Sequence, residues 1–206
     1  EQYSSLRPDF SETFSPNLPG GLNIGTHLFW QHTIDNQRFM DSDWILTLPQ
    51  YFGWRWTGLA VSEISYLGCH SDLWSLRDNK LSSIVYKLNW EKKIPPLTEA
   101  GKLIGEFQLP DRDQRLIIHN GVHDSNANLY FYKSLGYENF TLVSTGTWII
   151  AMNTETPLHV LNENQDMLAN LTVDGRSVAT ARFMGGREFD ILCDDLQATS
   201  ITLEDI

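Results

Sequence analysis

The sequence predicts an α/β protein of two lobes, because helical and strand-like patterns follow one another in a clear order. Segments with helical spacing of apolar residues dominate residues 24–89, and short runs of strand formers dominate residues 102–183. A Pro95-Pro96 pair separates the two regions. This order favours an α/β architecture over an all-helical or all-β one.

Composition and charge are those of an ordinary globular protein. Apolar residues make up 41% and charged residues 20% of the 206 residues, which allows a sizeable core. The net charge is -11 and the sequence contains no Lys/Arg cluster, which argues against nucleic acid as a partner. No stretch reaches the ~18 consecutive apolar residues of a membrane span, so no membrane partner is expected.

The N-terminal residues and the cysteine content favour a cytoplasmic protein. The first residues, EQYSSLRPDF, lack the basic segment and apolar core of a secretory signal. Cys69 and Cys193 are too few for a disulfide framework, so a reducing cytoplasm is expected. Because the first residue is not Met, we expect that something upstream has been removed.

The first half of the chain is predicted to be mainly helical. Residues 1–23 are rich in Ser, Pro and Gly and predict an extended, loop-like segment. Pro49 suits the first turn of a helix, where its missing N–H is not needed. The aromatic residues of Tyr51–Trp56 are expected to lie in the core. Helices are predicted at Ile24–Thr33, Pro49–Thr57, Ser62–Gly68 and Leu81–Asn89.

The second half is predicted to alternate strands with two helices. One helix, Asp124–Leu135, is closed by Gly136, and a last helix, Arg187–Leu196, follows Gly185-Gly186. Strands are predicted at Lys102–Phe107, Arg115–His119, Phe140–Ser144, Trp148–Asn153, Asp166–Val173 and Ser177–Phe183.

Asp124 stands where a strand-like run gives way to a helix. A carboxylate in the first turn of a helix meets the positive end of the dipole and several unpaired N–H groups. This environment favours the ionised form that a general base requires. The alternative is a plain N-cap, a role that Asp commonly fills, and from Asp124 alone this simpler interpretation is favoured.

The Ser144-Thr145-Gly146-Thr147 turn lies between two predicted strands. A tight turn containing Gly exposes backbone N–H groups, and the flanking hydroxyls add further donors, a combination that binds phosphate. The alternative is an ordinary hairpin turn without a ligand. Alone, the turn does not decide between them.

Two groups of residues have the side chains of a metal site. They are His119, His123 and Asp124, and the segment Cys69–Asp72. Neither has the spacing of a zinc hydrolase helix, so the sequence predicts no metal ligands. Glu63, His70 and Asp72 lie in a segment that lines a cleft or forms solvated surface, and the sequence leaves both open.

Several segments carry a resemblance through their order and spacing. They are "ILTLPQYFGWRWTGLAVSEISYLGCHSDLW" (Ile45–Trp74), "IPPL" followed by "GKLIGEF", "GVHDSNAN" (Gly121–Asn128), "STGTW" (Ser144–Trp148) and "RFMGGREFDIL". Together they resemble the FGGY family of carbohydrate kinases, particularly its rhamnulokinase- and fuculokinase-like members. The resemblance covers nearly the whole chain, and the Gly-x-His-Asp and Ser-Thr-Gly-Thr-Trp blocks are its most specific parts.

The resemblance implies an α/β, actin-like ATPase (ribonuclease H-like) fold. Residues 1–132 would form the C-terminal part of the first, sugar-binding lobe, and residues 133–206 the start of the second, nucleotide-binding lobe. It also implies a cytoplasmic enzyme that uses ATP and Mg²⁺. The implied reaction is transfer of the γ-phosphate to a hydroxyl of a ketose or related sugar, of the L-fuculose, L-rhamnulose or D-xylulose class.

The resemblance also implies a role for each matching residue. Asp124 would be the catalytic base that takes the proton from the sugar hydroxyl. His123 and Ser125 would contact the sugar. The phosphates of ATP would be held by the turn residues Ser144, Thr145, Gly146 and Thr147.

Two family motifs do not occur in the sequence. These are the Asp-x-Gly-Thr phosphate hairpin and the Gly-rich adenosine motif. We therefore expect the chain to be a central piece of a longer kinase that is inactive by itself. Two alternatives remain. The first is a non-catalytic actin-like module for sugar binding or assembly, and the second, ranked below it, is a metal-dependent hydrolase. The sequence leaves open which sugar is used and the oligomeric state, a homodimer included.

Overall fold

The computed structural model describes residues 2–195 and begins with a helical region. Two short strands, β1 (Trp74–Ser75) and β2 (Lys80–Leu81), pair within it. The core of this region surrounds the fully buried Leu73, Ile84 and Trp90. Its helices are η1 (Tyr3–Ser5), α1 (Phe10–Thr13), η2 (Pro19–Gly21), α2 (Ile24–Ile34), α3 (Asn36–Asp41), α4 (Leu48–Thr57), α5 (Ile64–Leu67), α6 (Ser83–Lys87) and η3 (Glu91–Lys93).

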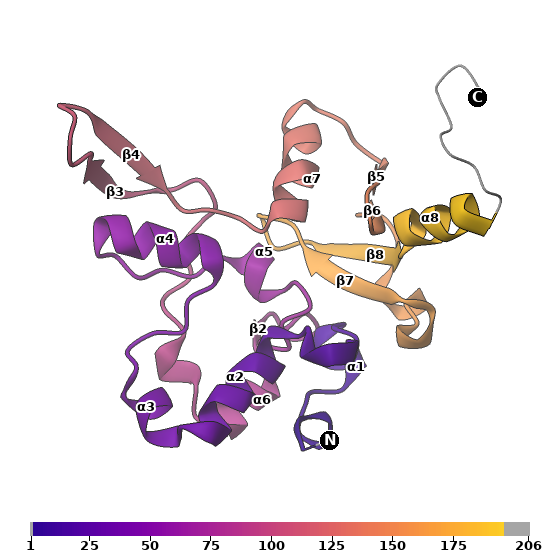
Figure 1. Cartoon of the computed structure of the whole chain (residues 1–206), viewed down its shortest axis with the longest axis horizontal. Helices are drawn as coiled ribbons and strands as arrows, with labels where there is room; N and C mark the ends of the chain where they lie inside the picture. Colours follow the sequence, from indigo (N-terminus) through magenta and orange to yellow (C-terminus); the bar gives the residue numbers. More distant parts are fainter. Residues whose placement is uncertain (1, 196–206) are drawn as a thin grey trace.

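An antiparallel hairpin, β3 (Leu103–Gln108) and β4 (Arg115–His119), extends from this region beside α4 (Figure 1). Two glycines allow the hairpin to approach α4 closely. A Cβ on Gly53 would lie 2.8 Å from Ile104, and one on Gly105 would lie 2.9 Å from the Thr57 side chain. Gly105 also has a φ of +151°, which other residues rarely adopt.

The second half forms a four-stranded antiparallel sheet in the order β5-β6-β8-β7. Helix α7 (Asp124–Ser134) packs on it, because its buried Leu129 clusters with Met152 and Val178 of the sheet. Helix α8 (Gly185–Asp195) follows the last strand. The strands are β5 (Thr141–Ser144), β6 (Ile149–Asn153), β7 (Met167–Leu171) and β8 (Ser177–Phe183), with η4 (Leu158–Val160) and η5 (Glu163–Gln165) between β6 and β7. The predicted lobe boundary at residues 132/133 falls within α7 and stays a prediction.

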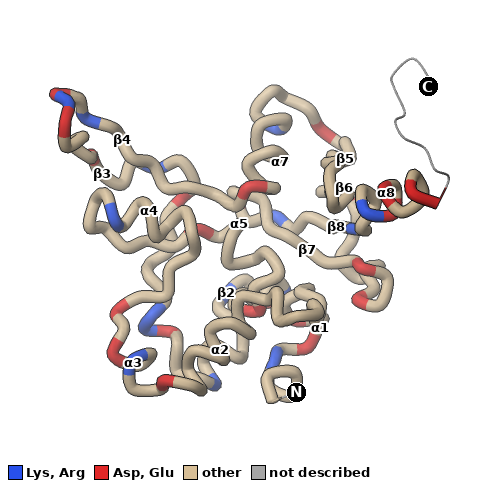
Figure 2. Tube along the Cα trace, in the orientation of Figure 1, with Lys and Arg blue, Asp and Glu red and all other residues tan. Residues whose placement is uncertain are grey.

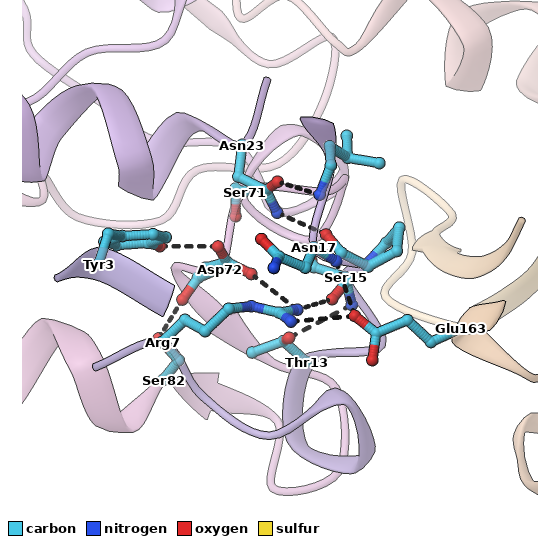
Figure 3. Close-up of polar contacts among 12 residues, drawn as sticks. Tyr3, Arg7, Thr13, Ser15, Asn17, Asn23, Ser71, Asp72, Ser82 and Glu163 are labelled. Atoms are coloured by element: carbon cyan, nitrogen blue, oxygen red, sulfur yellow. Dashed lines mark hydrogen bonds and ion pairs between the residues drawn. The ribbon is translucent and has the colours of Figure 1, made fainter. Parts of the chain in front are cut away.

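Polar contacts join the N-terminal segment to the region before β7 (Figure 3). Arg7 Nη1 lies 2.9 Å from Glu163 Oε1, and the Asn17 amide donates to the same oxygen at 2.7 Å. The hydroxyl of Tyr3 donates to Asp72 Oδ2 at 2.7 Å. Burial raises the pKa of Asp72 to about 6, although the Tyr3 hydrogen bond and the Arg7 charge oppose the rise. Asp72 is therefore a buried structural group rather than part of an open cleft.

Two predictions for the helical region are wrong. Part of residues 1–23 is helical rather than extended, since Phe10–Thr13 forms α1, and Phe14 ends it after one turn with a left-handed φ of 49°. The aromatic residues of α4 are not core. Tyr51, Phe52 and Trp56 are 43–45% exposed, because α4 packs through Gln50 and Gly53 instead.

Charged residues are interspersed along the chain (Figure 2). Lys/Arg and Asp/Glu positions are scattered over the trace, and most of it carries neither. Within residues 2–195, no helix has both the length and the apolar character that crossing a membrane requires. Both cysteines, Cys69 and Cys193, are free.

Candidate active site

Asp124 is the first residue of α7, and its side chain is 92% exposed. The N-cap position belongs to His123, whose side chain makes no capping hydrogen bond. Asp124 Oδ1 instead accepts from the backbone amide of Ser125 at 2.6 Å. The carboxylate therefore lies at the positive end of the helix and is open to a ligand. The simpler N-cap interpretation of Asp124 is not what the structure shows.

His123 packs beside Asp124 with little exposure. Its side chain is 12% exposed and meets the ring of Tyr66 edge-on, with centroids 5.0 Å apart. Burial lowers the pKa of His123, and the Asp124 charge offsets part of this shift. His123 Nδ1 lies 3.3 Å from Asp124 Oδ1, yet the contact does not have hydrogen-bond geometry. At neutral pH His123 is therefore an uncharged neighbour of the carboxylate.

Helix α5 holds the first turn of α7 in place. Glu63, buried before α5, accepts from the backbone amides of Ser65 at 3.0 Å and Tyr66 at 3.1 Å. Asn126 of α7 donates to the carbonyl oxygen of Leu171 on β7 at 2.5 Å and lies 3.4 Å from that of Ser65. Burial raises the pKa of Glu63 despite the hydrogen bonds that lower it. Glu63 is thus a support of the site and does not line an open cleft.

The Ser144–Thr147 turn connects β5 to β6 at one end of the sheet. Trp148, the residue after it, stacks under the guanidinium of Arg182, which lies 5.0 Å from the ring centroid. Arg182 is held by Asp166, with Nη2 3.1 Å from Oδ1. The turn is therefore braced by a cation–π contact from the neighbouring strand β8.

The N-terminus of α8 lies directly against this turn. The backbone amide of Gly186 donates to the carbonyl oxygen of Thr147 at 3.2 Å. A Cβ on Gly186 would come within 2.5 Å of the Gly146 oxygen, so glycine is required for the approach. A helix N-terminus and a turn with exposed amides and hydroxyls are both anion-binding features, and here they meet at one place.

His70 lies beside His123. Its ring is 6.0 Å from that of His123, with the planes nearly perpendicular at 85°. Burial lowers the pKa of His70, the neighbouring His123 and Arg182 both disfavour its protonation further, and Asp124 opposes this shift. His70 is therefore uncharged beside His123 at neutral pH. No hydrogen bond or ion pair within residues 2–195 joins Asp124 directly to the turn.

The structure brings together only some residues of the two candidate metal groups. His119 is engaged elsewhere, since its Nδ1 lies 2.6 Å from the Gly101 carbonyl oxygen, and Asp72 is engaged by Tyr3. Instead, Cys69 and His70 meet His123. The sequence analysis did not predict the approach of Cys69 and His70 to His123, nor the contact of Arg182 with Trp148. In each case the residues that meet are more than 30 positions apart in the sequence.

Comparisons with known proteins place the chain among the carbohydrate kinases. Residues 137–205 match the model of the carbohydrate kinase FGGY C-terminal domain. A carbohydrate kinase from Novosphingobium aromaticivorans is 38% identical, with a TM-score of 0.84 over 94% of this chain. The chain spans only 44% of the length of that kinase. A search of curated protein sequences finds no match.

Two more distant structures share the fold. A gluconate kinase from Lactobacillus acidophilus, 15% identical, has a TM-score of 0.72 over 98% of this chain and 41% of its own. A xylulose kinase from the same organism, 13% identical, has a TM-score of 0.70 over 98% of this chain and 41% of its own. These similarities confirm the expected α/β, actin-like ATPase fold.

Proposed function

Because the chain belongs to the FGGY family of carbohydrate kinases, we propose that the intact protein transfers the γ-phosphoryl group of ATP to a sugar hydroxyl. The acceptor is a ketose or related sugar of the L-fuculose, L-rhamnulose or D-xylulose class, and the reaction takes place in the cytoplasm. The observation that carries the proposal is the exposed carboxylate of Asp124 at the positive end of α7, beside the buried, neutral His123.

Asp124 acts as the general base. It takes the proton of the sugar hydroxyl as the hydroxyl oxygen forms a bond to the γ-phosphorus, and the bond from that phosphorus to the β,γ-bridging oxygen breaks to release ADP. His123 orients the acceptor from the side of the carboxylate, and Ser125 contacts it from the next position of α7. An exposed carboxylate suits this role, since it must reach a ligand that enters from solvent.

The turn residues Ser144, Thr145, Gly146 and Thr147 hold the phosphates. Backbone amides and hydroxyl groups of the turn provide donors for phosphate oxygens, and the positive end of α8 beside the turn adds to the attraction. The donor set fits phosphate rather than a bare metal ion, because hydroxyls and amides carry no negative charge. Mg²⁺ bound to the phosphates supplies charge neutralisation during transfer.

The substrate class is tested by coupled ADP-release assays on the intact protein with L-fuculose, L-rhamnulose and D-xylulose. The proposal expects Mg²⁺-dependent ADP release that requires one of these sugars. Sugar binding without ADP release would support the non-catalytic actin-like module instead.

The same assay applies to the 206 residues alone, which we expect to be inactive because the Asp-x-Gly-Thr hairpin does not occur in them. Sugar-dependent turnover by these residues would contradict this part of the proposal. The division into lobes at residues 132/133 belongs to the same proposal.

A further inference from the structure

Three side chains from two distant segments meet beside the proposed base. Cys69 and His70 follow α5, and His123 precedes α7. One potential ligand atom of each lies within 4.8 Å of the others. The cluster is a group of sulfur and imidazole ligands, and the proposed kinase reaction assigns no role to Cys69 or His70.

Two ring nitrogens of this cluster are buried and make no hydrogen bond. Nδ1 of His70 and Nδ1 of His123 are both buried without a hydrogen bond. Within residues 2–195 no hydrogen bond engages the thiol of Cys69, which is 2% exposed. A buried polar group without a partner costs about 1–3 kcal/mol, and a metal ion bound between the two rings would give both nitrogens a partner.

The backbone around Cys69 and His70 is held in place by other segments. His70 and Asp72 have left-handed φ values of 35° and 63°, a conformation that non-glycine residues seldom adopt outside special sites. The segment is fixed from outside by the hydrogen bond from the Gly25 amide to the Ser71 carbonyl oxygen at 2.8 Å. It is also fixed by the bond from the Tyr3 hydroxyl to Asp72 at 2.7 Å. Cys69 and His70 are thus presented in a preorganised turn.

We propose that Cys69, His70 and His123 form a zinc-binding site. One thiolate and two imidazoles match the ligand preference of Zn²⁺ and do not suit Mg²⁺ or Ca²⁺, which favour oxygen. Tetrahedral zinc holds such ligands roughly 3.5 Å apart, so closure from the present spacing needs side-chain shifts of about 1 Å. Three protein ligands leave a fourth position open.

The position of the site has a consequence for the proposed kinase reaction, and this consequence rests on the proposed function. Zinc bound through His123 removes that ring from the sugar and places a dication beside Asp124. Zn²⁺ is therefore an inhibitor that competes with the sugar, while Mg²⁺ does not occupy the site.

The site is tested with Co²⁺ as a spectroscopic probe in the intact protein, which requires no turnover. The proposal expects one Co²⁺ per chain and a thiolate-to-cobalt charge-transfer band that stoichiometric Zn²⁺ removes. Cys69→Ser abolishes the band, and His70→Gln weakens Co²⁺ affinity by about tenfold or more. Matched controls are Cys193→Ser on α8 and His119→Gln on β4, and both retain the wild-type spectrum.

X-ray absorption of the zinc-loaded wild-type protein keeps the test independent of how the variants fold. One sulfur and two nitrogen ligands at about 2.3 Å and 2.0 Å are expected. Absence of the charge-transfer band in the wild type, its persistence in Cys69→Ser, or a first shell of oxygens alone would overturn the zinc site. None of these results bears on whether the protein is a kinase.

Discussion

The backbone amide of Gly186 donates a hydrogen bond to the carbonyl oxygen of Thr147 over 3.2 Å. This contact sets the N-terminus of α8 against the turn that we propose holds the phosphates of ATP. It connects two segments that are separate in the sequence, and the lack of a side chain at Gly186 makes it possible.

Gly186→Ala is expected to disturb the turn. The added methyl group would lie 2.5 Å from the Gly146 oxygen and 2.9 Å from the Thr147 Cα, and both are backbone atoms that cannot rotate away. We expect KM for ATP to rise about tenfold or more while KM for the sugar stays unchanged. Steady-state kinetics on the intact protein measures this, with the exposed Asp190→Ala on α8 as control. Equal rises in both KM values would show that the contact does not act on the nucleotide side alone.

Asn126→Ala is expected to loosen α7 from the sheet. The buried Asn126 amide donates to Leu171 of β7, so its loss leaves that carbonyl oxygen without this donor. We expect the free energy of unfolding to fall by about 2 kcal/mol. Urea denaturation measures the change, and Asn128→Ala, an exposed change on the same helix, should cost less than about 0.5 kcal/mol. Equal costs for the two variants would contradict the role given to Asn126.

Arg7→Met is expected to weaken the link between the N-terminal segment and η5. The side chain of Arg7 is 11% exposed, and that of its partner Glu163 is 31% exposed. Removing the cation leaves the carboxylates of Glu163 and the buried Asp72 without their positive partner. We therefore expect the free energy of unfolding to fall by about 2 kcal/mol.

The matched control for Arg7→Met is Arg115→Met. Its ion pair with Glu106 is mostly exposed, at 74% and 56%, and should contribute less than about 1 kcal/mol. Chemical denaturation of both variants makes the comparison. A larger effect at Arg115 than at Arg7 would refute the assignment.

Glu63 predicts a pH dependence of stability. Burial raises its pKa above the ordinary value of 4.5, so the native state binds this proton more tightly than the unfolded state. The stabilisation is complete below about pH 4.5 and is lost as pH rises through the raised pKa. In Glu63→Gln this contribution disappears, and the variant should gain stability relative to wild type as pH rises from 4.5 to 8. Urea denaturation of both proteins across this pH range measures the change. A difference in the free energy of unfolding between variant and wild type that stays constant with pH would contradict the expectation.

Much of the local structure could be predicted from the sequence. Strands β4 and β8 have the predicted bounds, and α7 begins at Asp124 as expected, because apolar periodicity and the closing Gly136 are local signals. Helix α1 could not be found this way, since a single turn shows no period. The exposure of the α4 aromatic residues could not be predicted, because it depends on tertiary packing: Gly53 meets Ile104 of β3, and the buried Gln50 donates to Asn120 after β4.

The candidate site was predictable only in parts. Asp124 and the turn carry local signals of their own, and the family resemblance joined them. The approach of Cys69 and His70 to His123, and of Gly186 to Thr147, depends on how distant segments pack. A single sequence contains no direct signal for such contacts.

The central claim is that Asp124 is the base of a sugar kinase, and Asp124→Asn in the intact protein tests it most directly. The amide keeps the size of the side chain but cannot take a proton. We predict that kcat falls about 10³-fold while sugar affinity, measured by calorimetry, changes less than about threefold. Asp113→Asn in the exposed β3–β4 loop should retain full activity. Turnover of Asp124→Asn at the wild-type rate would contradict the assignment of Asp124 as the base.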